Sequence, residues 1–232
     1  MKAERKLARL IAEARRCRIC AEFLPHGPRP VLRLGMTARL LIVGQAPGRR
    51  VHETGIPWND PSGDRLRLWL GLDRERFYDE RSVAIMPMGF CFPGTDPKGG
   101  DRPPRPECAP HWHARLRALL PSVGLTLLVG SYAQAHYLGC RRKASMTETV
   151  RGFRDYLPEF LALPHPSWRN TGWLKRNPWF ARELLPELRA RVAAALAERK
   201  SDRANEPPPP LRGREGWGGG FEPQPQSRLS DG

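Results

Sequence analysis

Apolar runs alternate with amphipathic segments along most of the chain. Four apolar runs of strand length are each followed by a polar loop or turn, and they lie at residues 38–44, 82–90, 125–130 and 159–164. The first contains Leu40, Leu41, Ile42 and Val43 in succession. A continuous run of this kind is typical of a parallel strand that is buried on both faces. We therefore predict four strands of one sheet.

Helical spacing of apolar residues predicts the elements between these strands. Four such segments lie within residues 3–16, 65–72, 111–121 and 131–139. A terminal helix is predicted over residues 177–200, with Pro178 near its start, where proline is favoured. Strands that alternate with helices indicate a single α/β domain, in which helices cover both faces of a central, mostly parallel, four-stranded sheet.

The length of 232 residues suits one such domain with a hydrophobic core. Residues 201–232 are rich in proline, glycine and charged residues and lack periodicity, so we predict a disordered tail after a domain of residues 1–200. The formal net charge is +15, and the tail has four arginines against five acidic residues. The basic charge therefore belongs to the domain and favours a polyanion such as DNA, although basic surfaces also occur without one.

The location of the protein follows from its apolar segments. No apolar run approaches the length of a membrane span, and charges interrupt the apolar positions of the first twenty residues, unlike those of a signal peptide. We expect a cytoplasmic protein that is not bound to a membrane and that acts as a monomer. Its cysteines are then expected to be free of disulfides.

Four of the five cysteines have a spacing typical of a metal site. Cys17 and Cys20 form a Cys-x-x-Cys pair, and Cys91 and Cys108 lie in a later proline-rich loop. Four thiolates suit either zinc or an iron–sulfur cluster, and the spacing does not separate the two. Unrelated thiols are the alternative. Cys140 follows an apolar helix and is expected to pack against it.

Candidate site residues follow the predicted strands. The segment "GQAPG" at residues 44–48 ends the first strand without the glycines and lysine of a nucleotide-binding loop. Ligands of open α/β sheets bind at such carboxyl ends. Trp58 and Asp60 place an aromatic ring beside a carboxylate, and His165 follows the last strand, where it could donate to an anionic leaving group. Each also has a structural alternative, in the core for Trp58 and as a hydrogen-bonded structural residue for His165.

Taken in order along the chain, these motifs resemble the uracil-DNA glycosylase superfamily over roughly residues 17–180. The motifs are Cys-x-x-Cys, "GQAPG", "TGIPWNDPSG", "MGFC", "PEC", "LLVGSYA" and "HPSWRN". They are most similar to those of the iron–sulfur branches, families 4 and 5. This resemblance implies a four-iron, four-sulfur (4Fe-4S) cluster, with zinc as the less favoured occupant. Its ligands would be Cys17, Cys20, Cys91 and Cys108.

The resemblance also implies a function in base excision repair. The protein would be a DNA glycosylase that hydrolyses the N-glycosidic bond of uracil or another deaminated base in single- or double-stranded DNA. The implied catalytic residues are Asp60 and His165. The residues implied to contact the base are Gln45, Ala46, Trp58 and Met88. Those implied to contact DNA are Arg49, Arg50, Ser167, Trp168 and Arg169, and Arg102, Arg105 and Lys175 are expected to contact further phosphates.

Three positions depart from the family pattern. Ala46 stands where the highly active uracil enzymes have an aspartate, and Gln45 stands where the cluster-bearing uracil-specific branch has a glutamate. Pro87 replaces the asparagine that selects uracil. The substrate range implied by the resemblance therefore extends to hypoxanthine or xanthine.

The activating carboxylate must then come from another position. The segment "NDPSG" resembles the Gly-Asp-x-Ser-Gly segment of the branch with relaxed base preference, which implies Asp60, with Glu53 and His52 as the reserves. Two other functions remain open. One is a DNA-binding iron–sulfur protein of this fold with little or no glycosylase activity. The other is a zinc-containing hydrolase of free nucleosides, which the basic charge disfavours, because a small neutral substrate needs no such field.

Overall fold

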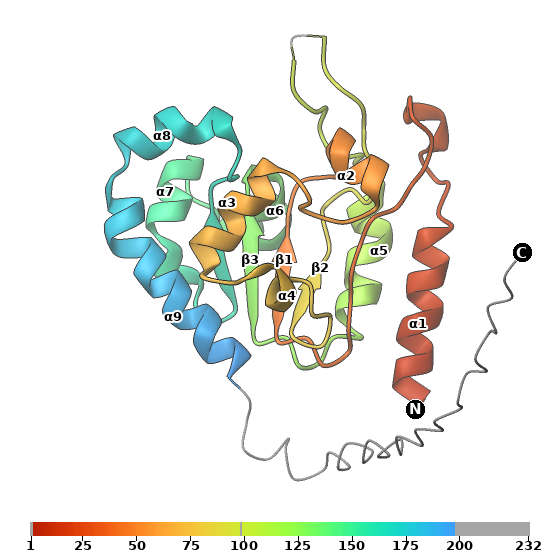
Figure 1. The fold of residues 1–232 in the computed structure, drawn as a ribbon, viewed down its shortest axis with the longest axis horizontal. Helices are drawn as coiled ribbons and strands as arrows, with labels where there is room; N and C mark the ends of the chain where they lie inside the picture. Colours follow the sequence, from red (N-terminus) through yellow and green to blue (C-terminus); the bar gives the residue numbers. More distant parts are fainter. Residues whose placement is uncertain (1, 98, 198–232) are drawn as a thin grey trace, which may run out of the picture. The chain divides into compact units, whose positions relative to one another are not determined.

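The central element of the protein is a sheet of four strands, which Figure 1 shows between helices on both sides. The computed structural model describes residues 2–97 and 99–197, so the tail predicted at residues 201–232 lies outside the described residues. The strands are β1 (Leu40–Val43), β2 (Val83–Ile85), β3 (Leu125–Val129) and β4 (Phe160–Leu163). Their order is β2-β1-β3-β4, and all three pairs are parallel. The predicted α/β architecture is confirmed.

Alternating side chains of β1 show why its apolar run has no polar positions. Leu40 and Ile42 belong to the core on one face of the sheet, and Leu41 and Val43 belong to the core on the other face. All four residues are fully buried. Since successive strand side chains point to opposite faces, a strand covered on both sides must be apolar throughout.

Long helices cover the two faces of the sheet. On one face lie α1 (Lys2–Arg15), α5 (Cys108–Arg117) and α6 (Ser131–Leu138), whose apolar residues share the core with Leu41 and Val43. On the other face lie α3 (Pro61–Leu70) and α9 (Leu185–Leu196), with a π-helical turn at Phe180–Leu184 before α9. The predicted helices are therefore present, although α5 begins three residues before its predicted start.

Four short helices were not predicted. They are α2 (Arg49–Thr54), α4 (Arg74–Phe77), α7 (Met146–Arg151) and α8 (Thr171–Arg176). Each has four to six residues, too few for a helical period to repeat. Local caps stabilise two of them, because Asp73 accepts from the N–H of Arg76 at the start of α4 and Ser145 forms a capping box with Glu148 at α7. Among the described helices, none is long and apolar enough to cross a membrane.

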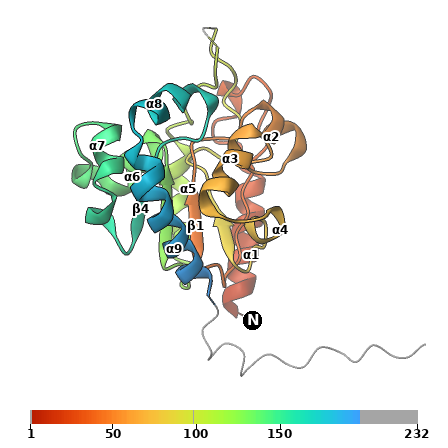
Figure 2. The same ribbon diagram turned by 60° about the vertical axis from the view of Figure 1, so that its left-hand side comes forward.

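Strand β2 is shorter than the predicted run of residues 82–90. The N–H groups of Met86 and Met88, on either side of Pro87, still donate to the carbonyls of Ile42 and Gly44, at 3.0 Å and 2.9 Å. The chain then stays buried to Gly94. Helices α2 and α8 lie at the same end of the sheet as a hairpin, whose described residues are 94–97 and 99–102, in both ribbon views (Figures 1 and 2).

Candidate active site

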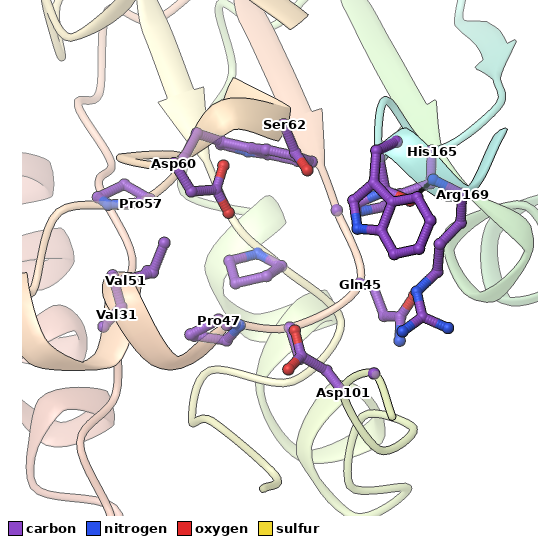
Figure 3. Close-up of a pocket in the computed structure, with 18 of the residues that line it drawn as sticks. Val31, Gln45, Pro47, Val51, Pro57, Asp60, Ser62, Asp101, His165 and Arg169 are labelled. Carbon is purple, nitrogen blue, oxygen red and sulfur yellow. Dashed lines mark hydrogen bonds between the residues drawn. The ribbon is translucent and has the colours of Figure 1, made fainter. Parts of the chain in front are cut away.

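A cavity of about 500 Å³ opens at the carboxyl ends of β1, β2 and β4. Its walls come from segments that are far apart in the sequence (Figure 3). Open α/β sheets bind ligands at this edge, and small-molecule sites have volumes of about 300–1,000 Å³. The predicted site residues that line the cavity are Gln45, Ala46, Trp58, Asp60, His165, Ser167, Trp168 and Arg169. Folding therefore brings together most of the predicted site.

The turn after β1 is shaped by its close approach to Trp58. A Cβ atom at Gly44 would lie 2.6 Å from Cζ2 of the indole, so a larger residue would collide with the ring. The loop after β2 holds the turn from another side, since the N–H groups of Met88 and Gly89 donate to the carbonyls of Gly44 and Gln45, each at 2.9 Å. The first glycine of "GQAPG" thus allows an aromatic ring to lie over the strand end.

Trp58 belongs to the buried core, as its structural alternative predicted, and it also lines the cavity, from a strained backbone conformation. Its φ is 57°, a left-handed value that costs a non-glycine residue about 1–3 kcal/mol. Arg67 donates to the Trp58 carbonyl at 3.3 Å, and a Cβ at Gly63 would collide with the same carbonyl. The Trp58 and His165 ring centroids are 5.5 Å apart. Strain that is held by neighbouring groups at a cavity wall is typical of a functional position.

Asp60 combines a structural contact with exposure to the cavity. Its Oδ1 accepts from the Gly63 N–H at 2.8 Å and caps α3, whose first residue is Pro61. Burial raises the pKa of the Asp60 carboxyl group, while the N–H groups of Gly63 and Ser62 act in the opposite direction. Figure 3 shows the same carboxyl group directed into the cavity. The residue is therefore a helix cap that can also meet a ligand.

His165 reaches the cavity from the turn after β4. Asn170 Nδ2 donates to the His165 carbonyl at 2.7 Å and stabilises this turn. Burial lowers the pKa of His165 to about 4. The imidazole is therefore neutral near pH 7, with one N–H available as a donor.

The rest of the same turn lies at the mouth of the cavity. Arg65 on α3 donates to the Ser167 carbonyl at 3.0 Å and ties the turn to the opposite wall. Trp168 is 74% exposed, and the Arg169 guanidinium lies 5.2 Å from the centre of its ring. The turn thus places an exposed aromatic ring and a cation side by side at the mouth of the cavity.

The sequence prediction missed Asp101, which also lines the cavity. It lies in the hairpin of residues 94–102, in a polar loop with no apolar period to indicate its place. Partial burial of its carboxyl group raises its pKa, and the negative charge of Asp60 acts in the same direction. The sequence signal that could have indicated its place is the pair Gly99 and Gly100, because a Gly-Gly dipeptide is typical of a turn. Both glycines have positive φ values in the structure.

Several predicted contacts lie outside the cavity. Arg49 and Arg50 are exposed at the start of α2, next to the residues that line it. The reserve residues His52 and Glu53 lie on the same helix and do not line it. Buried Met88 packs in the core, so only its backbone reaches the turn after β1 and the structure does not support its predicted base contact.

The outlying basic residues have different surroundings. Arg102 and Lys175 are exposed, on the hairpin and on α8. Arg105 instead pairs with Glu107 at 2.5 Å, and its guanidinium lies 4.1 Å from the centre of the Phe23 ring. Arg105 is thus held near the amino-terminal cysteines rather than free for a phosphate.

The four predicted thiol ligands line one small, separate pocket. The Phe90 N–H donates to the Cys108 sulfur at 3.3 Å, and the backbone N–H of Arg29 bonds the Cys91 sulfur. Burial raises the pKa of both of these thiols to about 12. Within the described residues, no three histidine, cysteine or carboxylate side chains are arranged to hold a single metal ion. Cys140 is exposed, so its predicted packing is wrong.

Comparison with known proteins places the chain in a family. A model of the uracil DNA glycosylase superfamily matches residues 33–189, more than half of the chain. The protein belongs to this superfamily. Among solved structures, it is similar to a candidate uracil DNA glycosylase from Methanosarcina acetivorans, determined by NMR, with 16% identity and a TM-score of 0.41. That match covers 68% of this chain and 93% of the other.

Proposed function

We propose that the protein is a DNA glycosylase that hydrolyses the N-glycosidic bond of uracil or another deaminated base in DNA and leaves an abasic site. The observation that carries this proposal is the convergence of Trp58, Asp60 and His165 on one cavity. Membership of the superfamily supports the reaction class. The net charge of +15 supports a polyanionic substrate.

The reaction needs opposite charges on the two sides of the bond that breaks. As the electron pair of the glycosidic bond passes to the base, the base becomes negative and the sugar becomes positive. Neutral His165 donates its N–H to the departing base, and Asp60 faces the sugar with a negative charge. Removal of one preorganised donor of this kind costs about 10²–10³ in rate.

The base must leave the stack before it can react. The Trp58 indole offers a flat surface on which a planar base can stack, and Trp168 at the mouth can fill the gap left in the DNA. Extrusion of a base costs a few kcal/mol in a duplex and less in a single strand. The exposed Arg49 and Arg50 would contact phosphates, so binding should weaken as salt concentration rises.

Base selection differs from that expected with an asparagine at position 87. Pro87 lines the cavity without a side-chain donor or acceptor. Its carbonyl is already bonded to Nε2 of His113, at 3.0 Å. This wall therefore discriminates by shape, which supports a substrate range that includes hypoxanthine or xanthine beside uracil.

The test is base excision from oligonucleotides that contain uracil, hypoxanthine or xanthine at one position, in single- and double-stranded form. We expect alkali-labile cleavage at one or more of these bases, and its loss in His165→Ala. The matched control is His111→Ala, which removes an exposed histidine on α5. Intact DNA binding without product from any base would refute the proposal and favour the DNA-binding function without catalysis.

We also propose that Cys17, Cys20, Cys91 and Cys108 hold a 4Fe-4S cluster with a structural role. Four thiols around a common pocket, with backbone N–H groups directed at two of the sulfurs, support this assignment. A cluster there would join the segment after α1 to the start of α5. Iron, acid-labile sulfide and zinc analysis of the purified protein tests the assignment, and stoichiometric zinc without iron would overturn it.

A further inference from the structure

The hairpin of residues 94–102 positions an acidic side chain at the cavity. The Arg102 N–H donates to the Gly94 carbonyl at 2.9 Å, the Asp96 N–H donates to the Gly100 carbonyl at 2.7 Å, and Thr95 pairs with Asp101. Figure 1 shows residues 94–97 and 99–102 at the end of the sheet where α2 and α8 lie. These backbone hydrogen bonds fix the direction in which the Asp101 side chain projects from the hairpin.

Neighbouring segments are shaped to receive this hairpin. A Cβ at Gly48 would lie 3.0 Å from Oδ2 of Asp101, so the glycine at the end of "GQAPG" makes room for the carboxylate. A Cβ at Gly100 would lie 2.9 Å from a guanidinium nitrogen of Arg169, so the turn after β4 packs against the hairpin. Asp101 is thus held between the turns that follow β1 and β4.

The carboxyl groups of Asp101 and Asp60 enter the cavity from different sides (Figure 3). They differ in their bonding. Asp60 accepts from the backbone N–H groups of Gly63 and Ser62. Within the described part of the chain, no group donates a hydrogen bond to the Asp101 carboxylate, and it forms no ion pair. Its oxygen lone pairs therefore remain available to accept from a ligand or a water molecule.

The charged groups that face Asp101 are Asp60, Arg49 and Arg169. Burial and the negative charge of Asp60 raise the pKa of Asp101, and the two arginines act in the opposite direction. A carboxylate with a raised pKa is a stronger base, and its unbonded oxygens can accept from a water molecule. These are the properties required of a group that orients and deprotonates a water molecule.

We propose that Asp101 is a second catalytic carboxylate, which accepts a hydrogen bond from the hydrolytic water and removes its proton, while Asp60 stabilises the positive sugar. This inference rests on the proposed glycosylase function. The C1′–N bond breaks and its electron pair leaves with the base. The water oxygen then bonds to C1′, its proton passes to Asp101 and then to solvent, and the base anion takes a proton from solvent.

The test compares Asp101→Asn with Asp60→Asn in single-turnover excision at saturating enzyme. The asparagine keeps the shape of the side chain but is a far weaker base. We expect Asp101→Asn to lose at least about 100-fold in rate, the lower limit of typical general-base effects, with DNA affinity retained or increased. The matched control is Glu159→Gln, which removes one negative charge from an exposed residue just before β4.

Further measurements separate catalysis from structure. The pH–rate profile of Asp101→Asn should lack the acidic limb of the parent's profile, or show it at a different pH. The melting temperature of the variant should match that of the parent. If the parent excises a base and Asp101→Asn is as fast as Glu159→Gln at saturating enzyme, the proposed role of Asp101 is refuted and the glycosylase proposal is not. If the parent forms no product from any base, both proposals are refuted.

Discussion

Replacement of Gly44 by alanine is expected to displace Trp58 and to lower both stability and base excision. The new Cβ would lie 2.6 Å from Cζ2 of the indole, well inside the ~3.5–4.0 Å of a favourable carbon–carbon contact. The ring cannot easily move away, because Gly63 packs against the Trp58 carbonyl and Arg67 is bonded to it. Overpacking of this kind costs about 1–3 kcal/mol.

Urea unfolding and thermal melting measure this cost. For a domain of this size, each kcal/mol lowers the melting temperature by about 2–4 °C. The matched control is Gly124→Ala, where a Cβ meets nothing within 4 Å. That change should be neutral or slightly stabilising, because alanine reduces the entropy of the unfolded chain.

Base excision provides the second measurement. We expect the single-turnover rate to fall in Gly44→Ala, because a displaced indole no longer offers a flat wall for the base, and to stay at the parent's value in Gly124→Ala. If both variants unfold at the same urea concentration and excise base at the same rate, the close approach of Gly44 to Trp58 does not shape the site.

Three further predictions concern pH, salt and the thiols. Since the pKa of His165 is about 4 in the folded state and near 6.5 when unfolded, the free energy of unfolding should fall as the pH drops through this window, by at most ~1.4 kcal/mol per pH unit for this group. Urea unfolding of His165→Gln should show a smaller slope there, and an unchanged slope would contradict the assignment. Arg50→Ala should reduce the salt dependence of DNA binding by ~0.9 in log–log slope if it contacts one phosphate, whereas Lys2→Ala, on the exposed end of α1, should leave it unchanged. Cys91→Ser should lower both iron content and melting temperature, and a fall in melting temperature with iron retained would argue against Cys91 as a ligand.

The apolar pattern predicts the sheet because a parallel strand buried on both faces has no position for a polar side chain. The run from Leu40 to Val43 is of this kind. The order of the motifs along the chain also indicates the family, and the match over residues 33–189 agrees with it. Trp58 and His165 could be placed in the site from this order, since they lie in the motifs "TGIPWNDPSG" and "HPSWRN".

The positions of the Asp101 and Met88 side chains could not be predicted from sequence patterns. Met88 lies in a recognisable motif, yet its side chain turns into the core and only its N–H reaches the turn after β1. Asp101 lies in a polar loop like many others, and its place at the cavity depends on hairpin bonds and on the space left by Gly48. Neither outcome has a periodic signal in the sequence.

The sequence by itself determined the strands, the main helices, the family and the set of residues near the strand ends. Strands buried on both faces of a sheet give continuous apolar runs, and amphipathic helices give apolar residues at helical spacing, so both can be recognised in the sequence. Only the tertiary structure decided which side chains share the cavity. That choice depends on close approaches between segments far apart in the chain, such as Gly44 with Trp58 and Gly48 with Asp101. Such contacts are set by packing in three dimensions, which no local pattern encodes.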